Sequence, residues 1–437
     1  MITTARASGF YKRKSKVSPP VFFDLLMYDV DTGRSKSLNQ LAIETMSEHD
    51  IGVTKQGIDK KFNEHTLMFL KRLIEKQLLV ELDNQIEAGW LSSFNRVTIK
   101  DGTRFELPEE YQDYLPGSGG SASKAGACLQ FEFNIKSGQV IDLNLTPANR
   151  PDAKDALEVL DTVAKNDLVI RDLGYFVLDS LSNISEKEAY YISRFNPQMC
   201  VFEMKRGLLK RLNFKTLYSQ MTKSRLVRIC KYVWIGSKVK MPLRMIFELL
   251  PDQVYEQRVR KIQKSHNKKG RSLSEEYKFL CRFNIYITNV SKAILPDEVI
   301  SALYRIRWQI ELIFKIWKSV IGIHNTRKMK YLRWVCLLYF KLLVMIINWN
   351  IILSYRNHLY NAKGRLLSLN KCYKTLFDNT YRLRDAIKTG SRGILKFVLW
   401  IEKILNENHW LERKNKSKGL EKILYLFYCK SNIYVYI

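Results

Sequence analysis

Hydrophobic residues in the first part of the chain recur three to four positions apart, the spacing of amphipathic helices. This pattern predicts helices over residues 21–28, 37–46 and 54–79. Ser37 and Thr54 stand where N-caps are expected, and Gly52 lies in the turn between the last two helices. The arrangement is typical of a helix-turn-helix, and a small helical bundle with ordinary surface lysines is the alternative. In position for a DNA major groove, the exposed side of the second helix would carry Lys55, Gln56, Asp59, Lys60 and Lys61.

From about Phe94 the hydrophobic period changes to that of strands. Strands are predicted over residues 96–101, 128–135, 140–145 and 168–172, and a helix over residues 151–165. Three strands, a helix and a fourth strand form the start of a mixed sheet with a crossover, in which the first and fourth strands can be neighbours. After Tyr190 the pattern stays that of strands. The polar stretch from Arg258 to Arg271 has the composition of a long hairpin loop.

Residues 301–320 contain no Gly or Pro and have branched and aromatic residues at helical spacing, which predicts a helix. Stepping about 100° per residue along this helix places four polar side chains in one narrow stripe beside an apolar face. These side chains are Tyr304, Arg307, Glu311 and Lys318. An ordinary i,i+4 ion pair between Arg307 and Glu311 is the simplest interpretation of part of this stripe.

The composition of the chain indicates the kind of partner that it binds. The 437 residues include 72 Lys and Arg against 43 Asp and Glu, a formal charge of +29, which favours nucleic acid first and an anionic membrane second. The most apolar run, residues 342–353, is too short for a membrane span of about twenty residues and predicts a buried core helix. No secretion signal is recognised at the N-terminus. The seven Cys include no close pair, which fits a reducing cytosol.

A basic block follows the fourth strand. Twelve Lys and Arg and no Asp or Glu occur from Lys205 to Arg244, so an anion is expected to compensate their repulsion. Aromatic residues interleave with these charges, and one of them could stack on an unpaired base, although a core position is the simpler interpretation for each. They are Phe214, Tyr218, Tyr232 and Trp234.

Two aspartates are expected at neighbouring strand ends. Asp101 ends the first predicted strand in Asp-Gly-Thr, and Asp172 ends the fourth in Asp-Leu-Gly-Tyr. If these strands are adjacent, both carboxylates leave the same edge of the sheet, and a divalent cation is the natural counter-charge. Taken singly, an Asp before Gly at a strand end is more often a turn residue.

Together these motifs resemble a known family. The spacing of Tyr304, Arg307, Glu311 and Lys318, with Tyr-Ile-Thr-Asn at 286–289 and the two aspartate motifs, resembles the Tyr-Arg-Glu-Lys group of bacterial insertion-sequence transposases of the DDE type. The resemblance covers roughly residues 96–355. Leu173 departs from it, because relatives often carry Arg there.

The resemblance implies an α/β fold with a ribonuclease H-like mixed sheet, a β-rich insertion and helical regions at both ends. The expected division is a helical DNA-binding domain at 1–88, a catalytic domain at 89–185 and 291–360, the basic insertion at 186–290, and a helical C-terminal region at 361–437.

The resemblance also implies a chemistry. Asp101, Asp172 and Glu311 would hold two Mg²⁺ or Mn²⁺ ions that hydrolyse the phosphodiester at transposon ends and support strand transfer into target DNA. Positioning of DNA phosphates would fall to Tyr304, Arg307 and Lys318, and binding of end DNA to Lys55 and Lys60.

The expected partner is double-stranded DNA, bound by a homodimer in the bacterial cytoplasm at the nucleoid, with no membrane involved. Two other functions are open: a non-catalytic, sequence-specific DNA-binding protein, and a metal-dependent nuclease without strand transfer.

Overall fold

The computed structural model describes residues 1–411 apart from residues 32–35, 81–88, 269, 271 and 364. The protein is a mixed α/β structure, as predicted, and contains many helices. Its residues form two compact units. Within the described part of the chain, the first unit comprises residues 1–86, 102–150 and 309–411, and the second comprises residues 87–101 and 151–308.

The first unit begins with short helices. They are α1 (Ile2–Ala7), α2 (Pro19–Asp31), α3 (Leu38–His49), α4 (Lys55–Asp59) and α5 (Glu64–Leu78). Ser37 starts α3 with a capping box, and the Thr54 side chain accepts a hydrogen bond from the backbone N–H of Gly57 at the start of α4. Both predicted N-caps are therefore confirmed.

The single helix predicted over residues 54–79 is wrong, because the chain breaks between α4 and α5. The Asn63 side chain accepts a hydrogen bond from the Thr66 backbone N–H and so begins a new helix. Lys61 is also not on an exposed recognition face. Its half-buried ammonium group donates to Ser15 Oγ and to the Val17 carbonyl, both at 3.0 Å.

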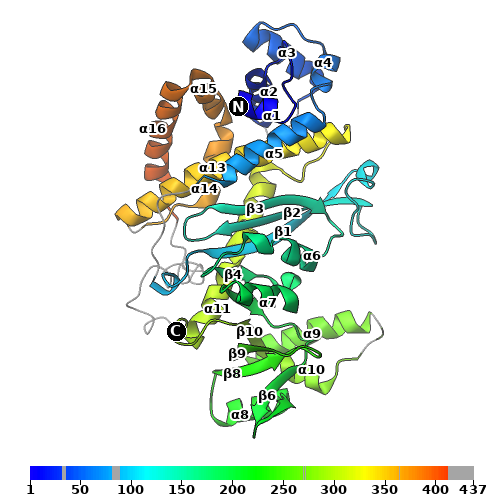
Figure 1. Cartoon of the computed structure of the whole chain (residues 1–437), viewed down its shortest axis with the longest axis vertical. Coiled ribbons are helices and arrows are strands. Elements are labelled where there is room, and N and C mark those ends of the chain that lie inside the picture. Colours follow the sequence, from blue (N-terminus) through cyan, green and yellow to red (C-terminus); the bar gives the residue numbers. More distant parts are fainter. Residues whose placement is uncertain (32–35, 81–88, 269, 271, 364, 412–437) are drawn as a thin grey trace. The chain divides into compact units, whose positions relative to one another are not determined.

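The core of the first unit lies between a β-hairpin and a long helix. Strands β2 (Ala125–Asn134) and β3 (Val140–Pro147) pair antiparallel, and α13 (Tyr331–Lys363) packs on their connection, where the Trp349 indole N–H donates to the Gly138 carbonyl at 2.6 Å. By length and composition α13 could cross a membrane, but 83% of its most apolar stretch is buried inside the protein. The predicted core helix over residues 342–353 is confirmed. Helix α5 runs along α13 (Figure 1).

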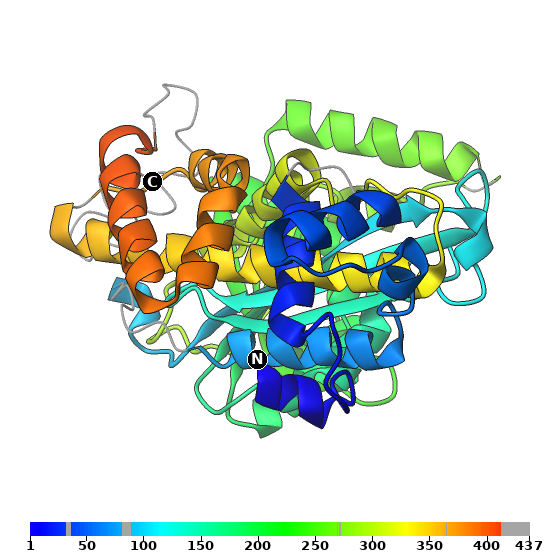
Figure 2. The same ribbon diagram turned by 90° about the horizontal axis from the view of Figure 1, so that it is seen from above.

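The described C-terminal residues are helical as predicted, and those beyond residue 411 lie outside the described part. The helices are α14 (Leu369–Asp378), α15 (Thr380–Thr389) and α16 (Ser391–Asn408). Helix α15 packs against α2, so helices from the N-terminal and C-terminal parts of the chain lie in one unit (Figure 2). Arg384 of α15 donates to both carboxylate oxygens of Asp24, at 2.8 and 2.7 Å, and to Glu44 at 2.7 Å.

The second unit contains a mixed sheet. The start of β1 (Val97–Leu107) pairs parallel with β4 (Leu168–Arg171), β4 pairs parallel with β5 (Tyr190–Arg194), and β5 pairs antiparallel with β10 (Phe283–Thr288). The prediction that the first and fourth strands are neighbours is confirmed. The helix predicted over residues 151–165 is shorter than expected. Residues 151–165 form α6 (Asp152–Glu158) and η3 (Leu160–Thr162) instead. After β4 the chain forms η4 (Leu173–Tyr175) and α7 (Leu178–Glu186).

Between β5 and β10 the chain adds strands to the same sheet. The order continues from β10 through β9 (Met241–Leu249), β8 (Arg228–Ile235), β6 (Val201–Lys205) and β7 (Leu208–Arg211). Helices α8 (Phe214–Lys223) and α10 (Glu275–Leu280) contact each other beside these strands. An apolar cluster that includes Val233, Met245 and Phe247 joins this segment to the rest of the unit.

The hairpin loop predicted over residues 258–271 is wrong, because most of it belongs to helix α9 (Asp252–Asn267). Helix α9 has apolar side chains at helical spacing, Tyr255, Val259 and Ile262, and they are half-buried rather than fully buried. The charged and polar residues between them outnumber these side chains, and they give the segment the composition of a loop.

The helix predicted over residues 301–320 is confirmed through most of its length. It consists of α11 (Asp297–Ile306), α12 (Trp308–Ile316) and the π-helical turn η5 (Trp317–Ile321). Arg307 lies in the turn between the first two. The short helices η1 (Gly89–Leu91) and η2 (Glu109–Tyr111) complete the described elements.

Candidate active site

Two aspartates occupy adjacent positions on neighbouring parallel strands of the second unit. The parallel register pairs Lys100 of β1 with Arg171 of β4, so Asp101 and Asp172 are the next residues along the two strands. Asp172 directly follows the last residue of β4, as the sequence indicated, and stands at the N-cap position of η4. The expected juxtaposition of the two carboxylates is therefore supported by the strand register.

Asp101 does not end its strand, which corrects the sequence prediction. Strand β1 continues to Leu107, because Gly102 serves close packing rather than a turn. A Cβ atom at Gly102 would lie 3.0 Å from Cys128 Sγ and 3.1 Å from Gln130 Oε1 on β2. The Asp-Gly-Thr motif thus marks a residue in the middle of a strand, directly after Lys100, the last residue of β1 that pairs with β4.

Arg307 and Tyr304 hold the two aspartates from the end of α11. Arg307 Nη1 donates to Asp101 Oδ2 at 2.7 Å, and its Nε lies 3.6 Å from Asp172 Oδ1. The buried Tyr304 hydroxyl donates to Asp172 Oδ1 at 3.0 Å. Burial, together with the charge of Asp172, raises the pKa of Tyr304 above its ordinary value, so the hydroxyl remains a proton donor. Of the predicted site residues, these four are brought together.

A buried ion pair lies beside this cluster, and the sequence analysis missed it. Lys100 is fully buried, and its Nζ lies 2.8 Å from Asp155 Oδ2 on α6. Arg171, its neighbour across the strands, is also buried and donates to the Ala156 carbonyl at 3.5 Å. The two cations fasten α6 to the strands that carry the aspartates. The available signal was a lysine inside a predicted strand, directly between Ile99 and Asp101.

Glu311 and Lys318 belong to the first unit. Glu311 is partly buried on α12. Lys318 on η5 donates from Nζ to the Arg104 carbonyl at 3.0 Å, and burial lowers the pKa of Lys318 from its ordinary value. Within the described part of the chain, no three His, Cys, Asp or Glu side chains are grouped so that they could hold a metal ion.

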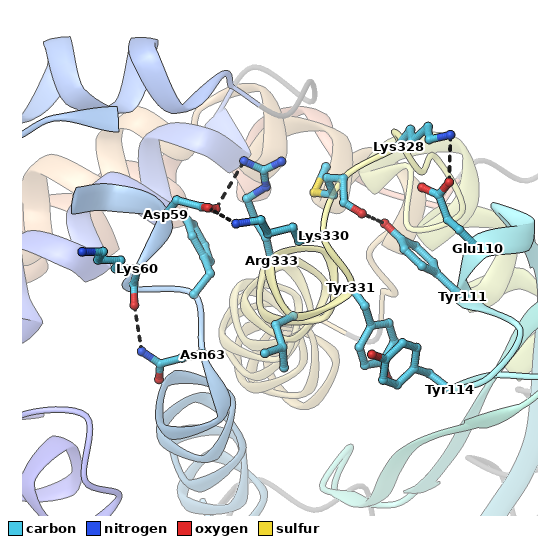
Figure 3. Close-up of a pocket in the computed structure, with 13 residues that line it drawn as sticks. Asp59, Lys60, Asn63, Glu110, Tyr111, Tyr114, Lys328, Lys330, Tyr331 and Arg333 are labelled. Carbon is cyan, nitrogen blue, oxygen red and sulfur yellow. Dashed lines mark hydrogen bonds and ion pairs between the residues drawn. The ribbon is translucent and has the colours of Figure 1, made fainter. Parts of the chain in front are cut away.

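Lys55 and Lys60 lie at the two ends of the short helix α4, and both are exposed. Lys60 lines a cavity of about 830 Å³ in the first unit (Figure 3). Lys55 lines an adjoining cavity of about 340 Å³. Of the aromatic residues predicted among the basic block, Phe214 is buried in the core and Tyr232 is exposed.

Known proteins resemble this chain over almost its whole length. The family described as "Transposase DDE domain" matches residues 92–348. A transposase for insertion sequence element IS231B from Bacillus thuringiensis subsp. berliner is 30% identical over 94% of this chain and 90% of its own length. A transposase for insertion sequence element IS231F from Bacillus thuringiensis subsp. israelensis is 29% identical over 97% of this chain and 92% of its own length. A transposase for insertion sequence element IS1151 from Clostridium perfringens is 27% identical over 90% of this chain and 87% of its own length.

Proposed function

The chain belongs to the DDE transposase family, and on this premise we propose that Asp101, Asp172 and Glu311 form its catalytic centre. It is a DNA transposase, an enzyme that cuts DNA and joins strands, and its family depends on a divalent metal ion. The observation that carries the proposal is the adjacency of Asp101 and Asp172 in register, both contacted by Arg307. Glu311 enters through its position four residues after Arg307 on the next helix.

The donor set fits the metal that the family requires. Carboxylate oxygens are hard ligands and suit Mg²⁺ or Mn²⁺, and three carboxylates with water and substrate oxygens can serve two such ions. When bound, the ions supply an activated attacking oxygen and charge stabilisation at the leaving oxygen. The chain's own groups orient the aspartates: Tyr304 fixes Asp172 Oδ1 through its hydroxyl, and Arg307 holds Asp101 Oδ2.

The remaining residues of the helical stripe and the N-terminal helices have a role in DNA binding in this proposal. Arg307 and Lys318 offset phosphate charge near the acids, and Lys55 and Lys60 bind end DNA from the first unit. The fold is of the ribonuclease H-like type, with the segment between β5 and β10 as its basic insertion. The protein acts as a homodimer on double-stranded DNA at the nucleoid, because two ends must be processed together.

Glu311→Gln tests the catalytic assignment. Purified protein is incubated with Mg²⁺ and labelled DNA that carries the element's own ends, and cleaved and joined products are separated on a gel. Glu311→Gln is expected to bind this DNA as the wild type does and to lose cleavage, because the amide does not hold a metal ion. The matched control is Glu298→Gln, an exposed position on α11, which is expected to cleave normally.

The same gel separates the alternatives. Cleavage without joined products in the wild type favours a nuclease, and binding without any reaction favours a DNA-binding regulator. Normal cleavage by Glu311→Gln overturns the assignment of Glu311.

A further inference from the structure

The larger cavity of the first unit brings together three segments that are distant in sequence. It lies between the end of α4, the loop after η2 and the start of α13. Its volume of about 830 Å³ falls in the range of small-ligand pockets, roughly 300–1,000 Å³. A few nucleotides of one strand fit in such a space, whereas a DNA duplex is too wide to enter it.

The cavity has more positive than negative side chains. Glu110 pairs with Lys328 at 2.9 Å, and Asp59 pairs with Lys330 at 2.6 Å and with Arg333 at 3.7 Å (Figure 3). These contacts hold the basic side chains in place without cancelling them, because four cations face two acids. The fourth cation, Lys60, is exposed and forms no ion pair with any described residue.

The adjoining smaller cavity is also lined by positively charged side chains. It shares Phe62, Lys328, Met329 and Arg333 with the larger cavity. No acidic residue lines it within the described chain, and it adds the basic residues Lys36, Lys55 and Arg327. The two cavities lie side by side, and the residues that line them together are called the basic channel. A polyanion is the partner that such a basic surface attracts.

A pair of stacked tyrosines stands in the wall of the basic channel. The rings of Tyr114 and Tyr331 lie 3.9 Å apart and within 7° of parallel (Figure 3). Tyr331 is supported from behind by Trp334, and the Tyr111 hydroxyl donates to the Met329 carbonyl at 2.6 Å, which fixes the segment that carries the lysines. Tyr114 is 58% exposed. A ring that is held flat on one face and open to solvent is a surface on which an unpaired base can stack.

We propose that the basic channel binds a short single-stranded segment of DNA, with one base stacked on Tyr114 and the strand's phosphates held by Lys60, Lys328 and Lys330. The ligand's identity as DNA rests on the proposed function. Charge alone would suit the outside of a duplex equally well, but bases inside a duplex are stacked on one another and cannot reach Tyr114. The combination of an open cavity of small volume, excess positive charge and an exposed aromatic ring favours unpaired nucleotides.

The test measures binding without metal, so that it does not depend on the catalytic centre. Fluorescence anisotropy in EDTA compares a labelled twelve-nucleotide oligo-dT with a blunt duplex. Tyr114→Leu is expected to weaken oligo-dT binding roughly fivefold to a hundredfold, the effect of losing one stacked base, and to leave duplex binding nearly unchanged. Tyr114→Phe keeps the ring and is expected to bind as the wild type does.

Salt dependence tests the phosphate contacts separately. Lys60→Gln is expected to reduce the slope of log K against log salt for oligo-dT by about 0.7, the value for one phosphate contact on a single strand. Tyr381→Leu, at another exposed tyrosine of the same unit, is the matched control and is expected to change nothing.

Crosslinking of the wild-type protein to oligonucleotides with 5-iododeoxyuridine avoids any question of variant folding, and Tyr114 is the expected crosslinked residue. Oligo-dT binding by a folded Tyr114→Leu equal to that of the wild type overturns the proposal. Equal losses for oligo-dT and duplex overturn it in favour of a duplex-binding surface. If Glu311→Gln cleaves normally while Tyr114→Leu loses oligo-dT binding, the catalytic assignment fails and the channel stands.

Discussion

Replacing Arg307 with Met is expected to strengthen the binding of a divalent cation while weakening DNA cleavage. Arg307 supplies positive charge to Asp101 and Asp172 in the metal-free protein, through contacts of 2.7 and 3.6 Å. A metal ion that binds these carboxylates must displace the guanidinium or share them with it. Methionine has a similar length and no charge, so it removes this competitor and leaves two carboxylates that repel each other.

The contacts set the size of the effect. A charge-assisted hydrogen bond contributes about 1.5–3 kcal/mol. The side chains of Arg307, Asp101 and Asp172 are 14%, 19% and 41% exposed, so solvent screens part of this energy. A discounted value of about 1–2 kcal/mol corresponds to an increase of roughly fivefold to thirtyfold in affinity for the metal ion.

Isothermal titration calorimetry with Mn²⁺ measures this affinity directly in the absence of DNA. Arg307→Lys keeps a positive charge and is expected to lie close to the wild type, and Asp101→Asn is expected to bind Mn²⁺ more weakly than both. Cleavage by Arg307→Met is measured in parallel at saturating Mn²⁺ and is expected to fall, because the positive charge near the phosphate is gone. If Arg307→Met binds Mn²⁺ no more tightly than the wild type, Arg307 does not compete for the carboxylates.

Three further predictions follow from individual contacts. Tyr304→Phe removes the hydroxyl that donates to Asp172 and is expected to slow single-turnover cleavage roughly tenfold, the effect of about 1.5 kcal/mol; an unchanged rate would show that this hydrogen bond does not orient the carboxylate. Arg384→Met leaves the buried Asp24 with weaker partners and is expected to destabilise the protein by about 3 kcal/mol in thermal unfolding, against less than about 1 kcal/mol for the exposed control Lys165→Met. Burial raises the pKa of Asp24, but the hydrogen bonds and charge of Arg384 outweigh burial and leave that pKa below its ordinary value, so this stabilisation is complete above about pH 4 and is lost as the pH falls through the lowered pKa of the folded state. In an Asp24→Asn variant, the free energy of unfolding should therefore fall less steeply below about pH 4 than in the wild type, because residue 24 no longer takes up a proton. An equally steep fall in the variant would contradict this assignment.

The strands that carry the aspartates were predictable because each has an unbroken apolar period. Asp172 follows a strand of four buried residues, and the neighbouring positions of β1 and β4 follow from the crossover through α6. The position of Asp101 inside a strand was not predictable, because an Asp followed by Gly102 is typical of a turn. Only the close approach of β2 explains that glycine.

The errors elsewhere have the same origin in tertiary contacts. The break between α4 and α5 depends on Asn63 as an N-cap, a weak signal inside a sequence that otherwise continues the helical period. The basic channel was not predicted, because Tyr114 and Lys328 belong to no motif and lie far along the chain from Lys60, which was predicted only as part of a helix-turn-helix. Helix α9 was missed because its few apolar side chains, such as Val259 and Ile262, stand at helical spacing among many more charged and polar residues, whose composition suggested a loop.

The fastening of α2 and α3 to α15 limits how such proteins can be recombined. Arg384 and Lys388 of α15 meet Asp24, Glu44 and Glu48 from the N-terminal helices, so the ends of the chain recognise each other's charges. A chimera that imports only the first eighty residues of a relative would confront these cations with foreign neighbours. A chimera should therefore fold stably when the donor supplies α15 together with α2 and α3.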